Sequence, residues 1–500
     1  MSHLIIVPIV LPVLAAVLVL LAGQRRQTLA RAISVASTSG LAAVALALLI
    51  AADTGEYRVY ALGQWAAPFG IVLVLDRLSA LMLLLTAVVG VCSLLYAVQG
   101  CDQQGKNFHA LFQFQLMGLN GAFLTGDLFN LFVFFEVFLI ASYGLLAHGG
   151  GEARLRAGIH YVVINLAGSA LFLIAVSLLY GVLGTLNMAD LALKVAAADI
   201  EDAALIRSAA LLLLVVFALK AALFPLYFWL PDAYSSASAP VAALFSIMTK
   251  VGVYAILRMY TLVFGAEAGA AQWVAAPWLL PAALATLALG MLGALASRRL
   301  KGLIAYLTVA SVGTLMAAVG LFSVDGIGAA LYYMAHSTLI IAVLFLLSDL
   351  IARQRGDHRD RLERAAPVAQ PVLLGILFFV GAIGVAGLPP LSGFIGKVMV
   401  LQSATATGAV YWVWGVVLAG GLLSIISLSQ AGSLLFWNTD VKAEKPFVAA
   451  PASAAAIMPV AALLAGIAAL SALAQPMKRF AGDAAVQLLH PAGYIHAVLG

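Results

Sequence analysis

The sequence predicts an all-α protein that crosses a membrane many times, and three observations lead to this fold class. First, 64% of the 500 residues are hydrophobic and only 9% are charged, whereas about a quarter of the residues in a soluble domain are charged. Second, apolar runs long enough to span a bilayer, which takes about 20 residues, follow one another along the whole chain. Third, two of these runs are interrupted by proline and glycine, which helix bundles in lipid tolerate.

The apolar runs predict about 14 transmembrane helices once the chain is divided at polar and Gly/Pro-rich breaks. The expected spans are 3–22, 30–51, 71–98, 108–124, 128–147, 157–182, 207–230, 239–264, 274–296, 302–322, 327–351, 371–403, 408–436 and 450–475. The first run lacks a basic segment before it and a clean cleavage site, so we expect a retained helix and not a signal peptide.

The cations of the loops indicate which side of the membrane each loop faces. With the N-terminus outside, the outside loops and the C-terminal tail contain Arg58, Lys194, Arg207, Lys478 and Arg479. The inside loops contain many more cations, namely Arg25, Arg26, Arg31, Lys106, Arg154, Arg156, Arg298, Arg299, Lys301, Arg353, Arg355, Arg359, Arg361, Arg364, Lys442 and Lys445. Because cytoplasmic loops are enriched in lysine and arginine, this asymmetry predicts an even number of spans and both termini outside.

Two of the expected spans are interrupted close to a lysine. Pro225 follows Lys220 in the seventh span, and Pro389 and Pro390 precede Lys397 in the twelfth. A proline removes an intrahelical hydrogen bond and kinks or ends the helix. Paired interrupted spans in two halves of a chain are typical of inverted-repeat transporters that bind their substrate at the breaks. We therefore expect two inverted five-helix repeats with broken helices 7 and 12, and the segments 1–107, 108–264 (helices 4–8), 272–437 (helices 9–13) and 438–500.

Glu136 and three lysines inside apolar runs are candidate functional residues. Glu136 lies among phenylalanines in the fifth span, and Lys220, Lys250 and Lys397 lie far from the ends of theirs. An ionisable group at this depth is expensive to bury and usually serves a function. A structural ion pair for Glu136, and snorkelling or helix pairing for a lysine, are the alternatives.

His336, in the eleventh span, is the fifth candidate. An imidazole titrates near neutral pH and therefore suits proton transfer, but a core histidine that hydrogen-bonds a neighbouring hydroxyl is an equally good interpretation. We expect Arg258 to reach the outer interface as a structural residue. Asp76 and Arg77 are expected to pair or to cap the third span.

The motifs of an enzyme or a driven pump are missing from the sequence. It contains no P-loop, no dinucleotide-binding fingerprint and no nucleophile–histidine–acid set. Two cysteines, Cys92 and Cys101, are too few for a zinc or iron–sulfur site. We therefore expect no cofactor, no metal and no nucleic-acid partner for this chain.

One long stretch resembles a known family. The sequence KAALFPLYFWLPDAYSSASAPVAALFSIMTKVGVYAIL, from Lys220 to Leu257, is similar to the core signature of the proton-antiporter family. That family includes the antiporter-like subunits of respiratory complex I and the Mrp-type (Mnh or Pha) cation/proton antiporter subunits. GLPPLSGFIGK, from Gly387 to Lys397, resembles the family's second helix break. Tyr227, Tyr234 and Ile340 stand where many relatives have histidines or a lysine, and this departure resembles the D-type subunit of Mrp antiporters.

The resemblance implies a proton relay through Glu136, Lys220, Lys250, His336 and Lys397, with the Glu136–Lys220 pair as a switch. It further implies a multi-pass protein of a bacterial cytoplasmic membrane, assembled with other membrane subunits into an antiporter for protons and sodium or another monovalent cation. Two alternatives remain at this stage. One is a proton-pumping subunit of a redox-driven complex of the NADH dehydrogenase type, and the other is a scaffold that conducts nothing.

Overall fold

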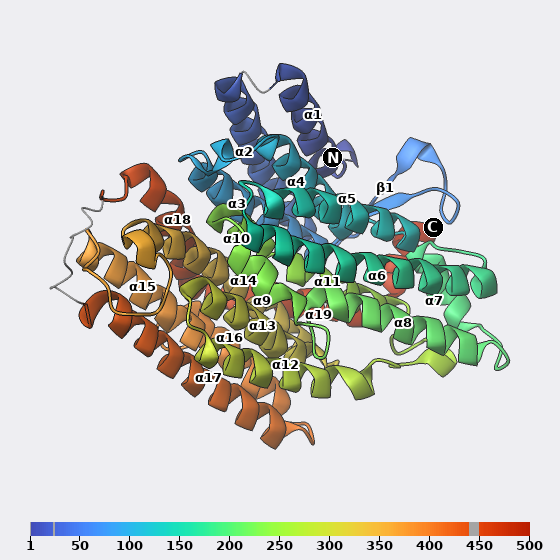
Figure 1. The fold of residues 1–500 in the computed structure, drawn as a ribbon. Coiled ribbons are helices and arrows are strands. Elements are labelled where there is room, and N and C mark those ends of the chain that lie inside the picture. The colour runs from blue at the N-terminus through green and yellow to red at the C-terminus, as the bar shows by residue number, and fades with distance from the viewer. Residues whose placement is uncertain (1, 24–25, 440–449) are drawn as a thin grey trace.

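The computed structural model describes residues 2–23, 26–439 and 450–500, and the fold is a large bundle of helices (Figure 1). Arg25, Lys442 and Lys445 of the expected inside loops lie outside the described residues, as does part of the segment 438–500. In the described part, eleven helices are long and apolar enough to cross a membrane. The predicted all-α polytopic membrane fold is confirmed.

Each expected span overlaps one helix or a pair of helices separated by a short break. The single helices are α1 (Val7–Ala22), α2 (Gln27–Ala52), α3 (Arg77–Ala97), α4 (Phe108–Leu124), α5 (Leu128–Ala147), α6 (Glu152–Leu183), α12 (Ala276–Ala296), α13 (Leu300–Val319), α14 (Val324–Arg353), α17 (Val410–Gly432) and α18 (Ala454–Ala472). The interrupted spans are α8 (Ala203–Ala221) with α9 (Trp229–Ser236), α10 (Ala239–Phe245) with α11 (Met248–Leu262), and α15 (Pro371–Ala386) with α16 (Ser392–Ala404).

The helices are arranged around α14, which is buried over almost its whole length. In Figure 1, α1 and α2 lie at one edge of the bundle and α15 and α17 at the opposite edge. Helices α10, α13, α16, α18 and α19 all pack against α14. A helix that is apolar all round belongs in the interior of such a bundle, and α14 carries the candidate residue His336 there.

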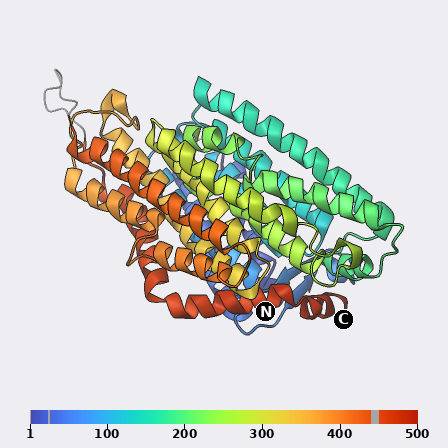
Figure 2. The ribbon, with the colours of Figure 1, turned by 90° about the horizontal axis from the view of Figure 1, so that it is seen from below.

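Some elements were not expected from the sequence. Strands β1 (Arg58–Ala61) and β2 (Val72–Leu75) form an antiparallel hairpin, so the expected span 71–98 begins with a strand and its helix begins only at Arg77. The further helices are α7 (Met188–Ala196), α19 (Ala474–Leu489) and α20 (Ala492–Leu499). Figure 2 shows the C-terminal helices lying across the ends of the spanning helices, so the tail is an ordered part of the bundle.

Asp76 and Arg258 connect the hairpin side of the bundle to α11. Asp76 caps α3 in a capping box with Ser79, as expected for a cap. Its carboxylate binds Arg258 at 2.6 and 3.0 Å, and both side chains are buried. The structural role that the sequence predicts for Arg258 is therefore that of a partner in a buried ion pair.

Both predicted breaks beside a lysine are present. Helix α8 ends at Ala221, and Ala222 adopts a left-handed conformation with φ 59° and ψ 47°. Helix α15 ends at Ala386, followed by Gly387 with φ 77° and ψ 45°. Beyond the first break, the backbone N–H of Phe224 donates to Thr286 Oγ1 of α12 at 2.7 Å. This bond satisfies a donor that lipid would leave unpaired.

Candidate functional site

Glu136 of α5 and Lys220 of α8 are joined through helix α6, which lies between them. Lys220 Nζ donates to Asn165 Oδ1 at 3.1 Å and to the main-chain oxygen of Asn165 at 3.4 Å. The hydroxyl of Ser169 contacts Glu136 Oε1 and also the main-chain oxygen of Asn165. The two predicted partners interact electrostatically, but the ion pairs found among the described residues do not include a direct Glu136–Lys220 bridge.

The two residues differ in burial. The Lys220 side chain is enclosed, with 5% of the residue exposed. Glu136 is only half-buried in this chain, whereas the sequence predicted a buried carboxylate. Lys220 therefore depends on protein groups for its hydrogen bonds, while Glu136 borders the surface of the chain.

Lys250 of α11 is fully buried, and its amine is unusual because Nζ has no hydrogen-bond partner among the described residues. Lys250 follows the short break between α10 and α11, which the sequence did not predict. Two residues further on, Gly252 packs directly against the end of α8. An added Cβ at Gly252 would lie 2.4 Å from the backbone nitrogen of Ala221. This close approach places Lys250 on a helix in contact with the one that carries Lys220.

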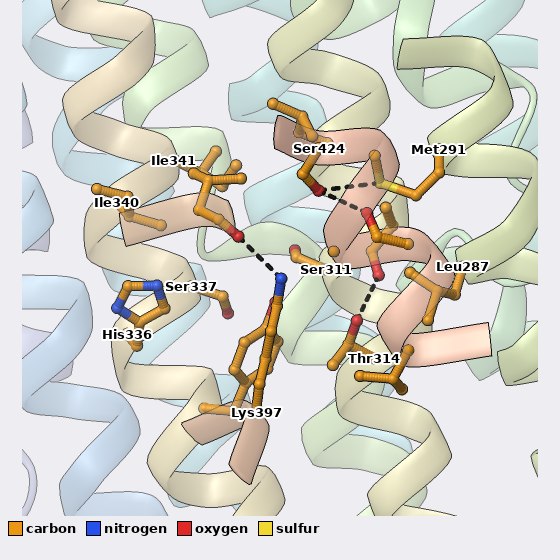
Figure 3. Close-up of a pocket in the computed structure, with 17 residues that line it drawn as sticks. Leu287, Met291, Ser311, Thr314, His336, Ser337, Ile340, Ile341, Lys397 and Ser424 are labelled. Atoms are coloured by element: carbon orange, nitrogen blue, oxygen red, sulfur yellow. Dashed lines mark hydrogen bonds between the residues drawn. The ribbon is translucent and has the colours of Figure 1, made fainter. Parts of the chain in front are cut away.

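Lys397 and His336 share a small cavity of about 20 Å³ at the second break (Figure 3). Lys397 Nζ donates to the main-chain oxygens of Val385 and Ala386 at 3.1 and 2.8 Å. These carbonyls belong to the last turn of α15, where the helix dipole favours a cation. Lys397 is half-buried, so it too is less enclosed than the sequence predicted.

His336 uses both ring nitrogens within the protein. Nδ1 lies 2.9 Å from Ser392 Oγ and Nε2 lies 3.1 Å from the main-chain oxygen of Gly384. Because a carbonyl oxygen only accepts, Nε2 carries a hydrogen and donates it to Gly384. In a neutral ring, Nδ1 is then the acceptor, and the Ser392 hydroxyl donates to it. The bond to a neighbouring hydroxyl, which was the alternative interpretation from the sequence, is therefore present. It does not remove His336 from the cavity that it lines with Lys397.

The five predicted residues thus form two groups and one isolated amine. Glu136 and Lys220 meet through α6, His336 and Lys397 meet at the cavity, and Lys250 is not among the residues that line that cavity. Ser311, Thr314, Ser337 and Ser424 add hydroxyl groups to the cavity wall. Amines, an imidazole, a carboxylate and hydroxyls can pass protons between them where water completes the path.

Sequence reasoning missed Asn165, Ser169 and Ser392. Asn165 and Ser169 lie four residues apart in an apolar run, so they face the same side of one helix. This four-residue spacing of two polar side chains could have indicated a polar face on the helix. Ser392 lies between the prolines of the second break and Lys397, where only the folded chain brings it to His336.

Interrupted helices with buried amines inside a polytopic all-α bundle are typical of membrane ion transporters. Residues 125–427 match the family of NADH:quinone oxidoreductase/Mrp antiporter transmembrane proteins. The chain belongs to this family, and within it to the D-type subunits of Mrp antiporters.

Three similar proteins match this chain over all or nearly all of their length. The D subunit of a probable K(+)/H(+) antiporter from Rhizobium meliloti is 43% identical, over 100% of this chain and 98% of the relative. The D subunit of the Na(+)/H(+) antiporter from Alkalihalophilus pseudofirmus is 38% identical, over 100% of both chains. A chain in the structure of the Mrp complex from Dietzia sp. superimposes with a TM-score of 0.88 at 30% identity, again over 100% of both chains. These relatives favour an antiporter subunit over a redox-driven pump.

Proposed function

We propose that the chain is the proton-translocating D-type subunit of a multisubunit antiporter that exchanges protons for sodium, potassium or another monovalent cation. The relatives from Alkalihalophilus and Rhizobium are named for sodium and potassium respectively, which supports a monovalent cation and leaves the choice between the two open. The excess of cations in the expected inside loops supports both termini outside. The paired breaks support the two repeats, 108–264 and 272–437.

In this proposal protons pass from Lys220 to Lys250, then to His336 and Lys397. Glu136 acts as the switch, because its charge determines how firmly Lys220 retains a proton. Proton influx through this chain would drive cation efflux elsewhere in the assembled complex, since the described residues contain no cluster of acidic side chains that could hold a metal ion. Other membrane subunits would then supply the cation path.

The strongest support for the proposal is the environment of the Lys250 amine. A fully buried amine without a hydrogen-bond partner among the described residues is costly for a folded protein to keep. It becomes tolerable if water reaches it or if it is neutral for part of the cycle. Both conditions suit a group that takes up and releases protons.

The test is Lys250→Ala in the complete complex, with cation-dependent proton transport measured in inverted membrane vesicles. Loss of a proton-transfer group is expected to lower antiport about a hundred-fold, with unchanged amounts of the chain in the membrane. Lys194→Ala is the matched control, because 42% of the Lys194 side chain is exposed and its amine pairs with Asp190 on α7. Full antiport by Lys250→Ala would contradict the relay, and loss of the chain from the membrane would favour a scaffold.

A further inference from the structure

Helix α6 places a polar bridge between the two groups of the proposed switch. Asn165 and Ser169 are one turn apart, and they are 1% and 4% exposed respectively. The main-chain oxygen of Asn165 accepts a hydrogen bond from Lys220 Nζ and lies 3.0 Å from Ser169 Oγ. Glu136, Ser169, Asn165 and Lys220 therefore form one continuous chain of hydrogen bonds.

The amide of Asn165 is held in one orientation. Its Nδ2 donates to the main-chain oxygen of Tyr161 at 2.9 Å, so Oδ1 is the atom that faces Lys220 Nζ. Gly168 of the same helix lies beside the amine, since an added Cβ at that position would be 3.8 Å from Lys220 Nζ. The acceptor side of the amide is thus fixed toward the lysine.

The hydroxyl of Ser169 has one proton and two acceptors, Glu136 Oε1 and the main-chain oxygen of Asn165. A charged carboxylate attracts the hydroxyl proton more strongly than a carbonyl does. When Glu136 is neutral, the hydroxyl turns to the carbonyl of Asn165, and that carbonyl then attracts the ammonium of Lys220 less. The direction of one hydroxyl therefore carries the charge state of Glu136 to Lys220.

We propose that Asn165 and Ser169 are positioning residues of the antiporter, which transmit the charge state of Glu136 to Lys220 through a hydroxyl and an amide instead of a direct ion pair. The inference rests on the proposed function of the Glu136–Lys220 pair. It adds to that function two residues and the path by which the two charges communicate.

The test is the pH dependence of antiport by the complete complex carrying Ser169→Ala or Asn165→Ala, measured in inverted vesicles. Each variant should lower antiport about ten-fold at the wild-type optimum, the size expected for a lost hydrogen bond to a charged group. The two variants should shift the pH profile in opposite directions, because one removes a donor from a carboxylate and the other removes an acceptor from an ammonium.

Ser169→Thr keeps the hydroxyl and should restore the wild-type profile. Ser177→Ala is the matched control, since Ser177 lies on the same helix but is exposed. Reduced antiport with an unchanged pH profile in both alanine variants would show a merely structural role and overturn the inference. Loss of antiport in Lys220→Ala together with wild-type behaviour of Ser169→Ala would overturn the inference alone. Full antiport in Lys220→Ala would instead overturn the proposed function.

Discussion

The two broken helices hold their lysines in different ways. At the first break, Lys220 lies in the last turn of α8 and is bound by a side chain and a carbonyl of another helix, α6. At the second break, Lys397 lies beyond the interruption in α16 and donates back to the carbonyls of α15, the first half of the same span. The first lysine is enclosed and the second is half-buried.

This difference indicates which part of the structure controls each amine. Lys220 responds to groups on α6 and, through them, to Glu136. Lys397 responds to the break itself, because the carbonyls that bind it exist only where α15 ends. The first break is thus arranged for control by a neighbouring charge, and the second for control by the geometry of the interrupted helix.

Lys220→Ala should have the largest effect, since it removes the amine on which the first break depends. Antiport by the complete complex is expected to fall about a hundred-fold, as for other losses of a proton-transfer group. The measurement is cation-dependent proton transport in inverted vesicles, normalised to the amount of this chain. Retention of more than half of the wild-type antiport rate would contradict the comparison of the two breaks, because antiport would then not depend on the lysine at the first break.

Gly387→Ala should destabilise the second break. A side chain at φ 77° costs about 1–2 kcal/mol, and the added Cβ would lie 2.5 Å from Lys397 Cδ. Thermal unfolding of the purified complex should therefore begin at a lower temperature, and antiport should fall because the amine is displaced.

Gly408→Ala is the control for that experiment, because an added Cβ there meets nothing within 4 Å. Equal thermal stability of the two glycine variants would show that the second break does not depend on its left-handed residue.

Ala222→Gly is expected to have the smallest effect and the opposite sign. Ala222 holds the left-handed position that Gly387 occupies at the second break. Glycine removes the strain of a Cβ but gains freedom in the unfolded chain, so we expect a net stabilisation of no more than about 1 kcal/mol. Unfolding temperature and antiport should be measured together. A destabilised variant would show that Ala222 is held by packing of its methyl group and not strained.

Much of the fold could be predicted because lipid restricts it so strongly. Any backbone that crosses the bilayer must satisfy its own hydrogen bonds, so long apolar runs had to be helices. Pro225 and the pair Pro389 and Pro390 marked the breaks for the same reason. Strand β2 was missed because its apolar residues continue the apolar run of the expected span 71–98. The helices α19 and α20 were missed because both are shorter than a membrane span.

The site was predicted as a set of residues but not as an arrangement. Lys220, Lys250 and His336 are buried as expected, whereas Glu136 and Lys397 are half-buried. The ion pair of Arg258 with Asp76, far away in the sequence, was not predicted. The spans are apolar on every side, so hydropathy alone could not show which face of each helix points inward.

The sequence by itself determined the order of the apolar spans, the positions of the breaks and the presence of ionisable groups within them. Each of these follows from local chemistry, namely the cost of unpaired backbone groups and of charges in lipid. Only the tertiary structure decided which groups meet. Helix packing brings Asn165 and Ser169 between Glu136 and Lys220, and joins His336 to Ser392. Such contacts depend on the rotation and depth of whole helices, which no single segment specifies.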